Sequence, residues 1–116
     1  FQPDEATLAL VDALPGDVHR GLISNTNEVH ALHLQRLLDL PRRFHTLTWS
    51  FQEGCLKPDP RIYAAALRRA GVKPAEAFFT DDLELHVEAA RALGLSAHHF
   101  RSAEGLRAAL VGHGLL

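Results

Sequence analysis

Short apolar runs alternate with helix-like segments along the whole chain, and this alternation restricts the fold more than any other feature of the sequence. Four runs are typical of buried strands: His19–Asn25, Thr46–Trp49, Ala77–Asp81 and Leu95–Phe100. The segments between them repeat apolar residues at helical spacing. Strands that alternate with helices in this way are parallel and joined by right-handed crossovers, with helices on both faces. We therefore predict an α/β fold with a Rossmann-like parallel sheet.

Capping residues and helix breakers set the ends of the predicted helices. Asp59 followed by Pro60 is a clear helix start, and Pro41 is expected to stop the second helix. Residues 50–58 are expected to form a loop. With their caps, the predicted helices run from Asp4 to Leu14, from Glu28 to Leu40, from Asp59 to Gly71, from Leu83 to Gly94 and from Ala103 to Val111.

Composition and charge exclude several classes of partner. A chain of 116 residues is one domain, residues 1–116. Lys and Arg number 12 against 14 Asp and Glu, with no basic run, which argues against nucleic acid as the main partner. No apolar run reaches the roughly 18 residues that a membrane span needs. The single cysteine, Cys55, excludes an internal disulfide and suits a reducing compartment, so we predict a cytoplasmic protein.

Polar side chains follow three of the predicted strands. Ser24 and Asn25 come after the first strand, Lys57 lies in the loop after the second, and Asp81 and Asp82 end the third. In an open parallel sheet, ligands bind outside the carboxyl ends of the strands. The topology therefore predicts that a hydroxyl, an amide, an ammonium and two carboxylates share one rim of the sheet.

The chemistry of this set suits a phosphate group and a divalent cation. Adjacent carboxylates such as Asp81 and Asp82 repel each other unless a cation lies beside them. Mg²⁺ meets that need, because it takes one or two protein carboxylates together with waters and phosphate oxygens. Lys57 would offset the remaining negative charge, and the Ser24 hydroxyl would donate to an oxyanion.

Each stretch also has a purely structural explanation. Asp82 is placed to cap the helix that begins at Leu83. Lys57 lies in a Lys-Pro-Asp-Pro sequence typical of a surface turn, and residues 24–27 suit helix capping. A functional site is favoured because all three stretches are expected at the same rim.

Histidine pairs elsewhere do not suggest a metal site. His30 and His33 can share a helix face, and His98 and His99 end a strand. Neither pair has a third ligand at metal-binding spacing, so we expect surface or rim positions for both.

Three stretches together resemble the second, third and fourth motifs of the haloacid dehalogenase superfamily. They are Leu22–Asn27, Lys57–Tyr63, and Phe78–Asp82 with the helix residues Val87–Ala90 and Leu93–Gly94. The resemblance covers nearly the whole chain and looks closest to small sugar-phosphate phosphatases and the phosphatase domain of epoxide hydrolases. It implies an Mg²⁺-dependent hydrolase of phosphomonoesters that forms an aspartyl-phosphate.

The resemblance also implies a role for each site residue. Ser24 would hydrogen-bond the transferring phosphoryl group, and Asn25 would line the same pocket. Lys57 would stabilise the phosphoryl oxygens and the nucleophile. Asp82 would bind Mg²⁺ directly, and Asp81 would act through a metal-bound water or from outside the ligand shell.

Two departures from the family pattern matter. His86 stands where relatives often carry Asp or Asn, and we expect it on an exposed helix face. The family's Asp-x-Asp nucleophile motif is absent from residues 1–20. We therefore expect the chain to be the C-terminal part of such a core domain, without its first strand and cap. A missing N-terminal segment or a partner chain would supply the nucleophile, and the strands leading to Ser24 and Asp82 would lack a common neighbour.

Other functions stay open from the sequence. A receiver-type signalling domain also uses acids, a hydroxyl and a lysine around Mg²⁺, but its acids come early and its lysine late. A catalytically inactive interaction domain could keep the same fold. A 2-haloacid dehalogenase is a third alternative, although it needs no metal, so the acid pair Asp81–Asp82 favours a phosphatase.

Overall fold

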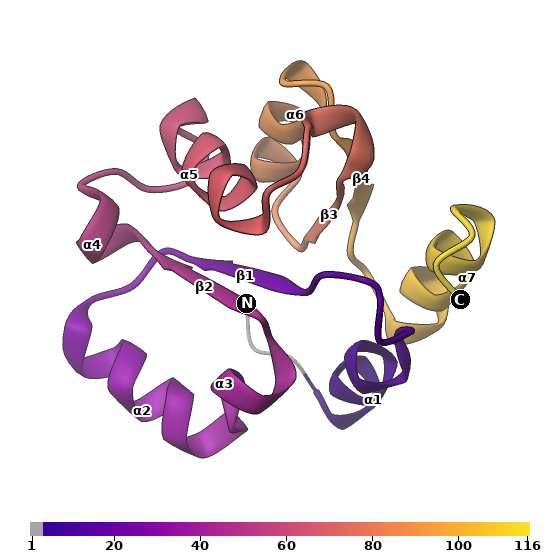
Figure 1. Ribbon diagram of the computed structural model, residues 1–116, viewed down its shortest axis with the longest axis horizontal. Coiled ribbons are helices and arrows are strands. Elements are labelled where there is room, and N and C mark those ends of the chain that lie inside the picture. Colours follow the sequence, from indigo (N-terminus) through magenta and orange to yellow (C-terminus); the bar gives the residue numbers. More distant parts are fainter. Residues whose placement is uncertain (1–3) are drawn as a thin grey trace.

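The computed structural model describes residues 4–116, so residues 1–3 of the predicted 1–116 domain lie outside it. Helices and strands alternate along the chain, as the sequence predicts (Figure 1). In order, the elements are α1 (Glu5–Ala13), β1 (Gly21–Ser24), α2 (Glu28–Leu38), α3 (Leu40–Arg43), β2 (Thr46–Trp49), α4 (Ser50–Glu53), α5 (Pro60–Ala70), the 3₁₀ helix η1 (Pro74–Glu76), β3 (Phe78–Asp81), α6 (Glu84–Ala92), β4 (Ser96–His99) and α7 (Ala103–Gly112).

The strands form two parallel pairs. β1 pairs with β2, with Ser24 opposite Trp49 at the carboxyl end. β3 pairs with β4, with Asp81 opposite His99. Within residues 4–116 no strand joins β1 to β3, and Figure 1 shows the pairs as separate ribbons. The predicted parallel α/β fold is confirmed, and so is the expectation that the strands carrying Ser24 and Asp81 have no common neighbour.

Alternating residues of each strand face different helical layers, because successive side chains of a strand point to opposite faces. Leu22 packs under α2 and α3 in a cluster around Leu40 and Trp49. Ile23 faces the other way, into a cluster built on Ile62 of α5 and on α6. Phe79 of β3 joins this same cluster. The layer of α5 and α6 therefore packs against both strand pairs and ties them together without a connecting ladder.

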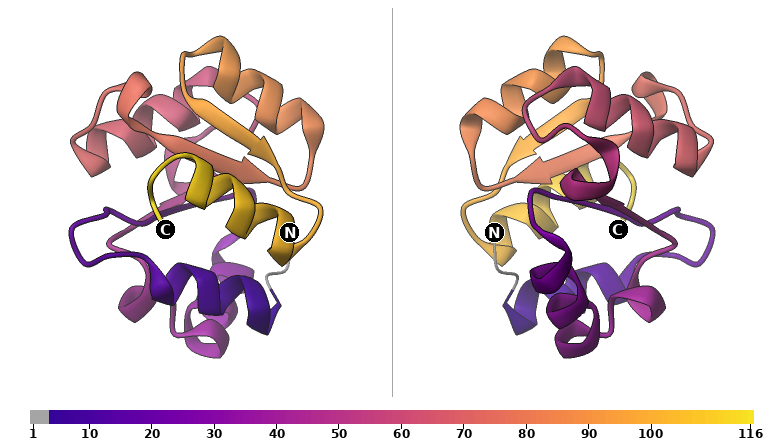
Figure 2. Two further views of the ribbon diagram at one scale, coloured as in Figure 1. Left: turned by 90° about the vertical axis from the view of Figure 1, so that its right-hand side faces the viewer. Right: turned by 90° about the vertical axis from the view of Figure 1, so that its left-hand side faces the viewer.

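Helices α1 and α7 pack together over the other face of β3 (Figure 2). The Asp4 side chain caps α1 by accepting a hydrogen bond from the Thr7 backbone N–H at 2.8 Å, as predicted. Leu10, Leu106 and Leu110 form the buried centre of this contact. Between Asp4 and Leu116, no helix has the length and apolarity to cross a membrane.

Two sequence predictions about local structure are wrong. The helix from Glu28 does not reach Pro41, because Asp39 turns left-handed, with φ of 52°, and ends α2 at Leu38. Pro41 instead lies in the first turn of α3, where a missing N–H is tolerated. The predicted loop from Ser50 begins with the short helix α4, which Gly54 ends at a positive φ of 71°.

Candidate functional site

Lys57 and Asp81 form a buried ion pair at the carboxyl end of β3. Lys57 Nζ lies 2.6 Å from Asp81 Oδ2, and the two side chains are 9% and 3% exposed. The loop before α5 supplies the lysine and the last residue of β3 supplies the acid. The sequence predicted these residues at one rim, and the structure brings them into direct contact.

Three donors converge on the Asp81 carboxylate. Besides Lys57, the Leu83 backbone N–H donates to Oδ1 at 2.9 Å, and His86 Nδ1 lies 3.2 Å from Oδ2. Burial acts to raise the pKa of Asp81, but the hydrogen bonds from Lys57, the Leu83 N–H and His86 outweigh burial and hold the pKa below its ordinary value. Asp81 is therefore a fixed anion that orients Lys57.

The Asn25 side chain holds the backbone of Lys57. Its Nδ2 donates to the Lys57 carbonyl at 3.0 Å, and its Oδ1 accepts from the Lys57 N–H at 2.8 Å. The Asn25 amide thus bonds through both its nitrogen and its oxygen to a residue 32 positions along the sequence. Sequence reasoning assigned Asn25 to the phosphate pocket and missed this contact, which no local pattern signals.

Asp82 has a different environment from its neighbour. It is exposed, and its side chain has no hydrogen-bond partner among the residues described. Its backbone carbonyl lies 2.9 Å from His99 Nε2, which fixes the main chain at this point. Helix α6 begins after Leu83 without a side-chain cap, so the alternative in which Asp82 caps the helix is wrong. The Asp82 carboxylate is available to a ligand.

Ser24 lies half-buried at the end of β1, on the same rim. Just beyond it, the Ser50 hydroxyl accepts from the Thr26 N–H at 2.8 Å and donates to the Thr26 carbonyl at 3.0 Å. These bonds fix the turn after β1 to the start of α4. Within the described chain, no hydrogen bond joins Ser24 to Lys57 or Asp81, so its hydroxyl is near the site but outside the ion-pair network.

His86 is buried, and the expectation of an exposed position is wrong. Only 9% of the residue is exposed, and its carbonyl accepts a hydrogen bond from the Tyr63 hydroxyl at 2.8 Å. Because a carboxylate only accepts, Nδ1 of His86 carries the proton that it shares with Asp81. The sequence did contain a signal: His86 stands three residues after Leu83 and four before Ala90, which places it on the inner face of α6.

The residues from 4 to 116 do not form a complete metal site by themselves. They contain no group of three or more His, Cys, Asp or Glu side chains that could hold a metal. Asp81 is already paired with Lys57, which leaves the Asp82 carboxylate as the candidate ligand. Mg²⁺ is commonly held by one or two carboxylates with waters and phosphate oxygens, and a single carboxylate ligand from Asp82 is consistent with that coordination.

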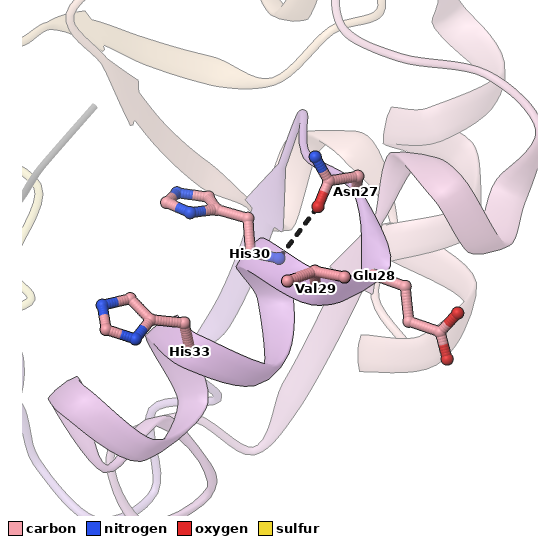
Figure 3. A pocket seen from close by; sticks show the side chains of 5 residues that line it. All are labelled: Asn27, Glu28, Val29, His30 and His33. Carbon is pink, nitrogen blue, oxygen red and sulfur yellow. Dashed lines mark hydrogen bonds between the residues drawn. The ribbon is translucent and has the colours of Figure 1, made fainter.

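A surface hollow elsewhere does not belong to this site. It measures about 620 Å³ and lies at the first turn of α2, lined by Asn27, Glu28, Val29, His30 and His33. Figure 3 shows both histidines on one side of the helix, and their ring centroids are 6.4 Å apart. The predicted surface position of this pair is confirmed. Lys57 and Asp81 are not among the lining residues.

Comparisons with known proteins give a family match and two curated relatives. A family model described as haloacid dehalogenase-like hydrolase matches residues 4–94. The chain is 39% identical over 71 residues to acyl-CoA dehydrogenase family member 10 of Mus musculus, covering 60% of this chain and 7% of that protein. It is 36% identical over 61 residues to bifunctional epoxide hydrolase 2 of Rattus norvegicus, covering 53% of this chain and 11% of that protein.

A solved structure adds a match in fold. A variant of a haloacid dehalogenase-family enzyme from Bacteroides thetaiotaomicron, in complex with magnesium and inorganic phosphate, has a TM-score of 0.69 and 28% identity. The alignment covers 82% of this chain and 50% of that one. This chain therefore spans half of that solved structure and much smaller shares of the two curated relatives. The resemblance predicted from the motifs is confirmed.

Proposed function

The chain belongs to the haloacid dehalogenase-like hydrolase family, and from that premise we propose that it forms part of an Mg²⁺-dependent phosphomonoester hydrolase. Its substrate would be a small phosphorylated metabolite, such as a sugar phosphate, hydrolysed through an aspartyl-phosphate. The proposal rests on one relationship: Asp81 fixes the Lys57 ammonium in a buried position, while the adjacent Asp82 keeps its carboxylate exposed.

This division of labour suits phosphoryl transfer, in which catalysis is mainly positioning and charge stabilisation. Lys57 would stabilise the oxygens of the transferring group and the nucleophile, and the clamp from Asn25 would keep the lysine loop in place. The Ser24 hydroxyl would donate to a phosphoryl oxygen. Mg²⁺, when bound, would neutralise charge on the phosphate, and Asp82 would be its ligand from this chain. Asp81 would act on Lys57 from outside the ligand shell.

The nucleophile would come from outside this chain, on an N-terminal segment or a partner chain. The separation of the two strand pairs supports this idea, because β1 and β3 each present an edge with unpaired backbone groups. One parallel strand between them would satisfy both edges and would end beside Lys57 and Asp81. If the isolated 116-residue chain released phosphate from a phosphomonoester at an ordinary rate with Mg²⁺, this part of the proposal would be wrong.

The activity is tested with the full-length protein that contains this chain. Release of inorganic phosphate from a panel of sugar phosphates is measured with Mg²⁺ and again after chelation. We expect turnover that chelation removes. The alternative dehalogenase would release halide from a 2-haloacid with or without metal, and the alternative interaction domain would do neither.

A further inference from the structure

A second cluster of charged side chains lies at the opposite end of β1 from the proposed active site. A cavity of about 290 Å³ is lined by Asp12, Arg20, Arg42 and Arg43. Arg20 directly precedes β1, whereas Ser24 ends it. Three arginines and one aspartate thus surround a space just below the usual range for small-molecule sites, roughly 300–1,000 Å³.

The three arginines are not equally paired. Arg43 Nη1 lies 2.8 Å from Asp12 Oδ2, and Arg42 Nε lies 2.7 Å from Asp39 Oδ2. Arg20 has no carboxylate partner within residues 4–116, and its one side-chain hydrogen bond, to the Val11 carbonyl, is long at 3.5 Å. The positive charge of Arg20 is therefore uncompensated inside the cavity.

Two guanidinium nitrogens in this cluster are buried without an acceptor. Nε of Arg20 and Nε of Arg43 have no hydrogen-bond partner among the described residues. Buried polar groups in native proteins nearly always have a hydrogen-bond partner, and leaving a buried charged group without one is unfavourable. The Nε atoms themselves have almost no exposed surface, but both side chains line the cavity, so an acceptor there would meet the other nitrogens of the same guanidinium groups.

The backbone of Arg20 is fixed in advance. Its N–H donates to His45 Nδ1 at 2.9 Å, and its carbonyl accepts from the His45 N–H at 2.7 Å. The guanidinium therefore extends from an anchored main chain, which lowers the entropy lost when a ligand binds.

We propose that this cavity binds a small oxyanion, the phosphate or carboxylate group of a metabolite. Guanidinium groups recognise both through paired N–H donors. Asp12, which also lines the cavity, would repel an anion, but Arg43 pairs with it and Arg20 leaves the net charge positive. The site is separate from Lys57 and Asp82, so it does not depend on the proposed hydrolase activity.

The test is a titration of the purified protein with inorganic phosphate, and in a parallel arm with acetate, at constant ionic strength in chloride. The readout is the ¹H–¹⁵N signals of the arginine Nε–H groups. We expect the signals of Arg20 and Arg43 to move in a saturable way. The Arg20→Gln substitution should weaken affinity by about tenfold or more, because it removes a charge-assisted hydrogen bond. The arm that saturates at lower concentration identifies the preferred group.

Matched variants keep the result specific. Arg107→Gln removes an exposed charge from α7 and should leave the affinity unchanged. Asp82→Asn alters the proposed catalytic rim and should also leave it unchanged, so loss of hydrolase activity and loss of this site are separable. If Arg20→Gln fails to fold, the exposed Arg42→Gln replaces it. The inference is overturned if chloride alone moves the same signals, or if the Arg20 and Arg42 variants bind both anions like the wild type.

Discussion

Lys57 and Asp81 meet across 24 positions of sequence in a contact of 2.6 Å that excludes most solvent from both side chains. The pair gives the two adjacent acids different roles, since Asp81 is committed to the lysine and Asp82 remains exposed. It also means that Lys57 contributes to the fold. A substitution there is expected to affect stability together with turnover, whereas the sequence suggested either a functional residue or an exposed surface turn.

Breaking the ion pair should destabilise the protein. Asp81→Asn leaves the Lys57 ammonium buried without a carboxylate, and we expect a loss of about 3–5 kcal/mol in the free energy of unfolding. Lys57→Met should be less damaging, because Asp81 keeps the Leu83 N–H and His86 as donors. Urea denaturation measures both. The matched control is Lys73→Met, which changes an exposed lysine that also precedes a proline; equal losses in Lys57→Met and Lys73→Met would contradict this account.

Removing the Asn25 clamp should loosen the lysine loop. Asn25→Ala deletes both hydrogen bonds to the Lys57 backbone, and we expect a loss of about 1–3 kcal/mol in unfolding free energy. Turnover of the full-length protein should fall as well, because Lys57 loses its position. Gln52→Ala removes an exposed amide in the neighbouring α4 and serves as the control. A clamp variant as stable and as active as the Gln52 variant would show that these bonds do not position the loop.

Tyr63 provides a spectroscopic test of burial next to the ion pair. It is the chain's single tyrosine, and burial, together with the negative charge of Asp81, raises its pKa to about 12. Absorbance of the tyrosinate should therefore appear near that pH, or when the protein unfolds, instead of near the ordinary value of about 10. Circular dichroism recorded in parallel separates the two cases. Tyrosinate forming near pH 10 in a natively folded sample would contradict the buried position.

Asp81 should make stability depend on pH in acid. Its pKa is lower in the folded state than in the unfolded state, so its contribution is complete above the unfolded value of about 3.9. That contribution is lost as the pH falls through the lower folded pKa, where the unfolded chain binds more protons. Between pH 6 and pH 2, about 4 pH units, the unfolding free energy should decline less steeply in Asp81→Asn than in the wild type. An unchanged slope would mean that Asp81 is not the linked group.

Local signals explain why most of the fold was predictable. The Asp59–Pro60 start and the Gly71 stop of α5 depend on cap chemistry and on a left-handed glycine with φ of 69°, which the sequence states directly. The apolar run through Phe78 and Phe79 likewise indicates a strand buried on both faces, and each phenylalanine packs against a different layer. The end of α2 was missed because Asp39 takes a left-handed conformation that the sequence pattern did not mark.

Contacts that depend on tertiary packing were not predictable in the same way. The Asn25–Lys57 clamp joins two loops that meet only because α5 packs against β1 and β2. The choice between Asp81 and Asp82 as the partner of Lys57 depends on which way the last residue of β3 points, and two adjacent acids look alike in sequence. Burial of His86 follows from its place on α6, but its contact with Asp81 needed the folded chain.

The exposed acid Asp82 carries the central claim, and its substitution tests it most directly. Asp82→Asn should leave stability within about 0.5 kcal/mol of the wild type, as is usual for an exposed residue. In the full-length protein it should lower Mg²⁺-dependent phosphate release by roughly 100-fold, because a metal ion supplies several kcal/mol of charge stabilisation. The decisive measurement is the rate of phosphate release by the wild type and by Asp82→Asn as a function of Mg²⁺ concentration. We predict a strict Mg²⁺ requirement in the wild type and the near loss of turnover in Asp82→Asn at every Mg²⁺ concentration. Metal-independent turnover, or an Asp82 variant as active as the wild type, would contradict this prediction.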